Sequence, residues 1–165
     1  MRIQQVLIAM FWLGLSACGY HLRDEVNLPS GMKNVYLDGA SMPLLNQFKK
    51  NLGDTLVKAD PTAPHAGITI RIFSEQSNQR VLSLSARGRS NELELYYRFE
   101  YEVIRPDGSL LAERQNLEIK REYFNNQQDI IAKANEETVI RSEMYQQAVR
   151  SVLDRTRVLL TNYSK

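Results

Sequence analysis

Cysteine and histidine are almost absent from this sequence of 165 residues, which contains one cysteine, Cys18, and two histidines, His21 and His65. A single cysteine excludes an internal disulfide framework and a cysteine-rich zinc site. Neither histidine has a partner at the spacing of a metal site or a catalytic triad, and no glycine-rich phosphate loop is present. The sequence therefore predicts no metal ion, no other cofactor and no enzymatic activity.

A strong excess of charge of one sign is also missing. Lys and Arg total 21 against 19 for Asp and Glu, so the formal net charge is +2. A dedicated nucleic-acid-binding domain is usually strongly basic, and no nucleic-acid partner is therefore expected. With 43% apolar residues, the chain is long enough for one packed domain and leaves little room for a second.

The first eighteen residues have the pattern of a targeting signal. Arg2 is followed by an unbroken apolar run at 6–15, which is too short for a membrane-spanning helix but suits the hydrophobic region of a secretory signal. The run ends in Leu-Ser-Ala-Cys at 15–18. This sequence resembles a bacterial lipobox, and the resemblance implies cleavage before Cys18 and acylation of Cys18.

We therefore expect 1–17 to be a cleaved lipoprotein signal peptide and Cys18 to attach the protein to the membrane through acyl chains. An ordinary secretory signal that ends at a cysteine by chance is the alternative. Gly19 follows the cysteine, and by resemblance to the bacterial sorting rule this residue directs a lipoprotein to the outer membrane. The polar segment 18–33 predicts an extended lead from the lipid anchor to the fold.

Residues 34–165 predict a single α+β domain that begins with a short strand and a helix. Ser41 is a suitable cap for this helix and Pro43 suits its first turn. Apolar residues at helical spacing predict its buried face: Leu45, Phe48, Leu52 and Leu56.

Three long strands are predicted next. Alternating apolar residues at 68–72 resume with the same parity at Leu82 and Leu84. The clearest alternation runs over 93–103, where apolar and mainly charged residues take turns, which is typical of a strand covered on one face only. The Arg-Pro-Asp-Gly turn at 105–108 predicts a hairpin into a return strand.

A long helix is expected from Ile130 to about Leu160, with a break near Asn135. The order β-α-β-β-β-α predicts a two-layer sandwich. In this sandwich both helices cover one face of a mostly antiparallel sheet of about four strands.

Basic residues beside predicted element ends are candidates for a binding surface. Arg87 and Arg89 fall at a strand junction, and Lys133 lies at the start of the long helix. Arginine binds phosphate bidentately, lysine binds it as a point charge, and a helix N-terminus adds backbone donors. Ordinary solvated surface charge is the alternative interpretation of these residues.

Several segments resemble one protein family. The segment 18–23, Cys-Gly-Tyr-His-Leu-Arg, is similar to the start of the mature lipopolysaccharide-assembly lipoproteins, the LptE/RlpB family. Further similar pieces follow in the family's order at 29–33, 124–126, 132–137 and 143–145.

This resemblance implies a lipoprotein on the periplasmic side of the outer membrane, seated as a plug in an LptD-like β-barrel that exports lipopolysaccharide. It also implies assistance in barrel assembly and binding of lipopolysaccharide, for which Arg87, Arg89 and Lys133 are the candidate residues. The residues by themselves leave two other hypotheses open. One is a periplasm-facing adaptor or inhibitor without lipid specificity, and the other is an anchored hydrolase.

Overall fold

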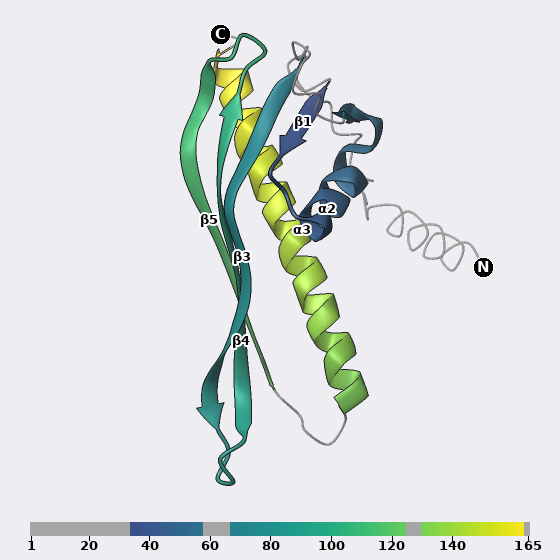
Figure 1. Ribbon diagram of the computed structural model, residues 1–165, viewed down its shortest axis with the longest axis vertical. Coiled ribbons are helices and arrows are strands. Elements are labelled where there is room, and N and C mark those ends of the chain that lie inside the picture. The colour runs from purple at the N-terminus through teal and green to yellow at the C-terminus, as the bar shows by residue number, and fades with distance from the viewer. Residues whose placement is uncertain (1–33, 58–66, 125–129, 164–165) are drawn as a thin grey trace, which may run out of the picture.

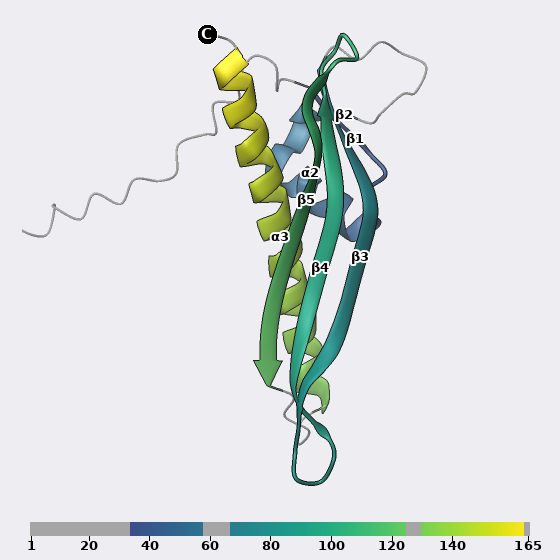
Figure 2. The same cartoon turned by 90° about the vertical axis from the view of Figure 1, so that its left-hand side faces the viewer.

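A sheet and two helices form the two layers of the fold, and both helices lie on one face of the sheet (Figures 1 and 2). The structure, a computed structural model, describes residues 34–57, 67–124 and 130–163. The elements are β1 (Val35–Asp38), α2 (Met42–Leu52), β2 (Leu56–Val57), β3 (Ile68–Leu84), β4 (Ser90–Ile104), β5 (Leu110–Phe124) and α3 (Ile130–Tyr163). The predicted α+β class and element order are confirmed. The expected signal peptide, the lead at 18–33 and the loop at 125–129 lie outside the described residues.

The sheet has the strand order β2-β1-β3-β4-β5. Strands β3, β4 and β5 form an antiparallel meander, whereas β1 runs parallel to both β2 and β3. The connection from β1 to β2 passes through α2, as a parallel pair requires. The sheet is thus mostly antiparallel as expected, and the two-residue strand β2 is an addition to the four predicted strands.

The core lies between β4 and the helices. The predicted alternation at 93–103 is confirmed, since the buried residues of β4 include Leu93, Leu95, Tyr97, Phe99, Tyr101 and Val103. Leu44 and Phe48 of α2 and Met144 and Val149 of α3 belong to the same buried cluster. Each such apolar side chain stabilises the fold by about 1.5–3 kcal/mol relative to exposure.

A bulge in β3 changes which face its residues occupy. The register with β4 shifts between Phe73 and Gln76, and Ser74 takes a φ of 51°. An extra residue in a strand moves every later side chain to the opposite face. The prediction that Leu82 and Leu84 continue the buried parity is therefore wrong, and both side chains are exposed.

The two helices differ from expectation at their ends. Ser41 caps α2 as predicted, with its hydroxyl accepting from Leu44 N, but α2 ends at Leu52. Leu56 therefore belongs to β2 rather than to the helix. Leu44 is buried while Leu45 is only partly buried. Helix α3 continues without the break expected near Asn135.

Candidate functional site

The candidate binding residues of the described elements lie at one end of the molecule. The β3–β4 hairpin turn, the end of β5 and the start of α3 lie together at the lower end of Figure 1. We call this region the hairpin end and define it as residues 81–92, Phe124 and the first turn of α3. The β4–β5 turn at 105–109 lies at the opposite end of the molecule.

The turn at the hairpin end has well-defined backbone geometry. Ser85 N donates to Arg89 O at 2.7 Å, and Gly88 N donates to Ser85 O at 2.9 Å. Gly88 has a φ of 71°, a left-handed conformation that glycine adopts without steric cost. The β4–β5 turn repeats the pattern, with Gly108 N donating to Arg105 O at 3.0 Å. Ordered turns at both ends fix the direction in which neighbouring side chains project.

The turn carries two of the three candidate bases. Arg87 and Arg89 are both exposed there, and both belong to the five-residue turn from Ser85 to Arg89. Lys133 belongs to the first turn of α3 at the same end, but its side chain lies outside the described residues. Cys18, the predicted lipidation site, also lies outside them.

Exposed apolar side chains concentrate at the hairpin end. Of the eight large hydrophobic residues that are exposed in the described part of the chain, four lie there: Val81 (51%), Leu82 (39%), Leu84 (65%) and Phe124 (68%). Scattered exposed apolar residues are ordinary, but a concentration of them indicates an interaction surface. Sequence analysis assigned Leu82 and Leu84 to the buried face, and the bulge reversed their parity.

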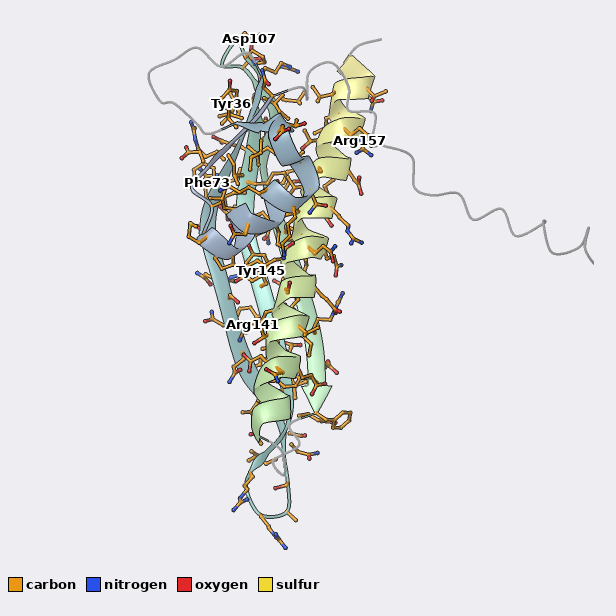
Figure 3. The ribbon with its side chains drawn as sticks, turned by 90° about the vertical axis from the view of Figure 1, so that its right-hand side faces the viewer. Tyr36, Phe73, Asp107, Arg141, Tyr145 and Arg157 are labelled. Carbon is orange, nitrogen blue, oxygen red and sulfur yellow. The ribbon has the colours of Figure 1, made fainter. Side chains whose placement is uncertain are left out.

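Polar contacts fasten α3 to the sheet just above this end. Tyr123 donates to Glu137 Oε2 at 3.1 Å, and Arg141 contacts both Glu137 Oε1 at 2.8 Å and Ser77 Oγ at 2.8 Å. Figure 3 shows Arg141 on the lower part of α3. Burial, together with the Glu137 hydrogen bond, raises the pKa of Tyr123 to about 12. These contacts join β5, α3 and β3, and they hold the hairpin end in a fixed relation to the helix.

Other bases near the hairpin end already have acidic partners. Arg80 lies 2.7 Å from Glu94, and Lys120 lies 2.5 Å from Glu118. These pairs belong to the sheet face opposite the helices, which we call the open face. The turn arginines, Arg87 and Arg89, lie nearer the tip of the β3–β4 hairpin than these pairs.

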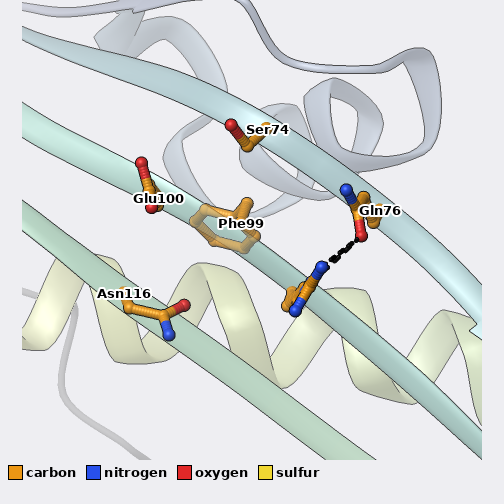
Figure 4. A pocket seen from close by; sticks show the side chains of 6 residues that line it. Ser74, Gln76, Phe99, Glu100 and Asn116 are labelled. Carbon is orange, nitrogen blue, oxygen red and sulfur yellow. Dashed lines mark hydrogen bonds between the residues drawn. The ribbon is translucent and has the colours of Figure 1, made fainter.

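The open face is polar and largely paired. Arg71 bridges Asp38 and Glu102, at 3.0 Å to each. A hollow of about 270 Å³ lies over β4, lined in part by Gln76, Glu100 and Asn116 (Figure 4). Arg98, which also lines this hollow, donates to Gln76 at 2.7 Å. Such a surface suits contact with water or with another polar surface.

The described residues show no arrangement for catalysis by a metal. No group of three or more His, Cys, Asp or Glu side chains among them could hold a metal ion. Within the same residues, no helix is both long enough and apolar enough to cross a membrane. The hairpin end combines cationic and apolar groups, which is the chemistry of binding to an anionic amphiphile.

The family model and the similar curated proteins carry the same family name. Residues 32–156 match the family model described as LptE, lipopolysaccharide-assembly. A protein of Photorhabdus laumondii named LPS-assembly lipoprotein LptE is 27% identical over 97% of this chain and 86% of its own. A protein of the same name from Pectobacterium atrosepticum is 24% identical over the same shares.

Solved structures share the fold. The solution structure of lipoprotein B from Nitrosomonas europaea has a TM-score of 0.66 and 26% identity, covering 87% of this chain and 93% of its own. The crystal structure of rare lipoprotein B from Shewanella oneidensis has a TM-score of 0.64 and 24% identity, covering 80% and 99%.

Proposed function

The chain belongs to the LptE lipopolysaccharide-assembly family, and we propose that it binds lipopolysaccharide at the hairpin end while seated in an outer-membrane β-barrel. Membership of the family identifies the chain as a lipoprotein of lipopolysaccharide assembly. The proposal adds the ligand site, the barrel partner and the location on the periplasmic side of the outer membrane.

The proposed attachment is through Cys18, after removal of 1–17. The lipobox at 15–18 and the lipoprotein names of the relatives support it. A single acyl chain binds membranes only marginally, whereas several chains anchor a protein stably. The segment 18–33 then connects the anchor to the folded domain.

The proposed barrel partner is an LptD-like protein, with this chain as its plug and as a factor in its assembly. The open face supports this part, because its paired charges match the polar interior of outer-membrane barrels. The expected result is that the tagged chain, purified from outer membranes, brings one β-barrel protein with it in equal amount. Purification without any barrel protein would favour the adaptor or inhibitor hypothesis instead.

The lipid-binding part depends on one observation, namely that the exposed guanidinium groups of Arg87 and Arg89 lie on an ordered turn beside exposed apolar side chains. The lipid portion of lipopolysaccharide carries phosphates on an acylated sugar. Arginine meets a phosphate with two parallel hydrogen bonds. Lys133 adds charge beside a helix N-terminus, where anions are favoured.

Charge reversal tests this part. The variant Arg87→Asp with Lys133→Asp should retain far less lipopolysaccharide than the unaltered protein and keep its circular dichroism spectrum, because exposed bases contribute little to stability. The matched control is Arg150→Asp with Arg155→Asp, two exposed bases on α3 away from the hairpin end. The control should bind normally. Full retention by the Arg87 and Lys133 variant would remove these residues from the site.

A further inference from the structure

Strand β5 is an outer strand of the sheet, and only one of its edges pairs with β4. Among the described residues, no strand pairs with its other edge. An open edge presents unpaired backbone N–H and C=O groups, which are a template for pairing with another chain. The outer strand at the opposite side of the sheet, β2, has two residues, whereas β5 has 15. The open edge of β5 is therefore the longer of the two.

Register shifts interrupt most of the open backbone edges of the sheet. Strand β1 covers β3 only at 68–71, and the rest of β3 is broken by shifts after Phe73 and after Val81. The first part of β5 contains two shifts as well. From Asn116 to Phe124, by contrast, β5 pairs with β4 one residue to one. We call this stretch the regular edge, and it is the longest uninterrupted open edge among the described strands.

Arg121 lies near the middle of the regular edge, at a position where the alternation calls for an apolar side chain. The residues of the same parity, Leu117, Ile119 and Tyr123, are buried on the helix side of the strand, whereas Arg121 is exposed. A charged residue on the inward-facing side of an edge strand opposes pairing with a further strand. Such a residue leaves a charge to be desolvated when the edge is covered.

The Arg121 guanidinium is bound to the backbone of its own strand. It donates to Lys120 O at 2.9 Å, and a second nitrogen donates to Gln147 Oε1 of α3. Carbonyl groups that face β4 are bonded by the ladder, so acceptance from a side chain is the expected state of a carbonyl that faces the open edge. Arg121 thus occupies an acceptor that an incoming strand would need.

The regular edge is suited to pairing with a second copy of itself. In an antiparallel pair centred on Ile119, Glu118 of each copy would lie opposite Lys120 of the other. Opposite charges at facing positions stabilise a strand pair. Both side chains are exposed, and they already attract each other within one chain at 2.5 Å.

We propose that Arg121 is a guard residue that keeps the regular edge from pairing with a second copy of this chain. An incoming strand would have to break the Arg121 bonds to Lys120 O and Gln147 and desolvate the guanidinium. This inference goes beyond the proposed function and does not depend on it, because it concerns neither the lipid nor the barrel.

The test measures self-association of the full chain by sedimentation, in one detergent at constant concentration. The variant Arg121→Thr removes the guard and keeps strand propensity. Its matched control is Arg98→Thr, which removes an exposed arginine from β4, a strand paired on both edges. Circular dichroism establishes that each variant is folded.

We expect Arg121→Thr to associate at least about tenfold more tightly than the unaltered protein, since one hydrogen bond from a charged group no longer has to be broken. Arg98→Thr should associate like the unaltered protein. Gln147→Ala, which keeps the charge of Arg121 but removes its contact on α3, should give a smaller increase. This variant also decides the matter if Arg121→Thr does not fold.

A charge swap tests the second copy as the partner and Ile119 as the centre of the pair. Adding Lys120→Glu to Arg121→Thr would place like charges opposite each other, so the gained association should be lost. Adding Glu118→Lys to both changes restores opposite charges and should restore the association. These exposed charges contribute little to the stability of one chain.

Three results would overturn the inference. One is unchanged association in Arg121→Thr, or in Gln147→Ala where the first variant is unfolded. Another is an equal increase in Arg98→Thr, which would mean that loss of charge alone causes association. The third is association of Arg121→Thr that the charge swap neither removes nor restores, which would place the contact elsewhere. Retention of lipopolysaccharide by Arg121→Thr tests the proposed function separately.

Discussion

The carboxylate of Glu75 accepts a hydrogen bond from the hydroxyl of Ser41 at 2.6 Å, and so joins the bulge of β3 to the N-terminus of α2. The same carboxylate accepts from Ser41 N at 2.8 Å and from the Tyr97 hydroxyl at 2.9 Å. Tyr97 in turn packs edge-on against Tyr145 of α3, with ring centroids 4.5 Å apart. Glu75 of β3 therefore contacts β4 and the N-cap of α2 directly, and it is connected to α3 through Tyr97.

Replacing the carboxylate of Glu75 should destabilise the fold. We expect Glu75→Ala to lower the free energy of unfolding by about 2–4 kcal/mol, because three hydrogen bonds to a charged acceptor are lost and the Tyr97 hydroxyl is left unpaired. Urea denaturation measures the change. The neighbour Gln76 is exposed and accepts from exposed Arg98, so Gln76→Ala should change stability by less than about 0.5 kcal/mol. Equal effects of the two changes would contradict this role for Glu75.

The backbone of the bulge should accept glycine better than it accepts a branched residue. Ser74 has a φ of 51°, where residues other than glycine are strained by roughly 1–2 kcal/mol. Ser74→Gly is therefore expected to preserve or slightly raise the urea midpoint, and Ser74→Val to lower stability by about 1–2 kcal/mol. A more stable valine variant would mean that the bulge is not formed as described.

Two Phe→Ala changes should differ in their effect on stability, because one removes a buried ring and the other an exposed ring. Phe99 is 1% exposed and Phe124 is 68% exposed. Phe99→Ala should cost about 3–5 kcal/mol, whereas Phe124→Ala should stay within about 0.5 kcal/mol. Thermal unfolding of the two variants side by side provides the comparison, and an unchanged melting temperature for Phe99→Ala would mean that the two faces of β4 are assigned the wrong way round.

Buried tyrosines should make the fold sensitive to alkali. Burial and the contact with Glu137 raise the pKa of Tyr123 to about 12, despite the opposing charge of Arg141, and burial with the charge of Glu75 raises the pKa of Tyr97. A raised folded-state pKa gives stability that is complete below about pH 10 and declines as pH rises through 10 to 12. Tyrosinate absorbance at 295 nm should show these two groups ionising only as the protein unfolds, and Tyr123→Phe should reduce the loss of stability above pH 10.

The lipid anchor is tested by Cys18→Ala. The substitution removes the sulfur that acylation requires, so an uncleaved precursor without acyl mass is expected by mass spectrometry of the membrane fraction. The unaltered protein should carry the acyl mass, and its processing should stop in globomycin. Finding processed, unacylated protein in untreated cells would leave only an ordinary signal peptide.

Sequence reasoning identified the buried face correctly where the alternation of apolar and polar residues was uninterrupted. The alternation over 93–103 identified the core face of β4, because that strand has a helix-covered face and a solvated face along most of its length. It failed at Leu82 and Leu84 because the bulge between Phe73 and Gln76 inserts a residue that the apolar alternation does not reveal. It also failed at Leu56, since Gly53, with a φ of 52°, ends α2 and returns the chain to the sheet.

The candidate site was predictable only in part. Arg87 and Arg89 were predicted as candidates from their place between two strands, and the structure places them on an ordered turn. Leu82 and Leu84 beside them were assigned to the interior, because an exposed leucine and a buried leucine look the same in a sequence. Only the register of β3 against β4 separates the two.

The parallel pairing of β1 with β3 also leads us to expect an order of assembly. Val35 pairs with Ile68, whereas Leu84 pairs with Ser90 across one short turn. Closing the short loops is fast and closing the long one is slow, so the meander of β3, β4 and β5 forms first and β1 docks on it later. Among the described strands, we therefore expect the one made first by the ribosome to be completed last, and the outer edge of β3 to be open until then to mispairing with other chains.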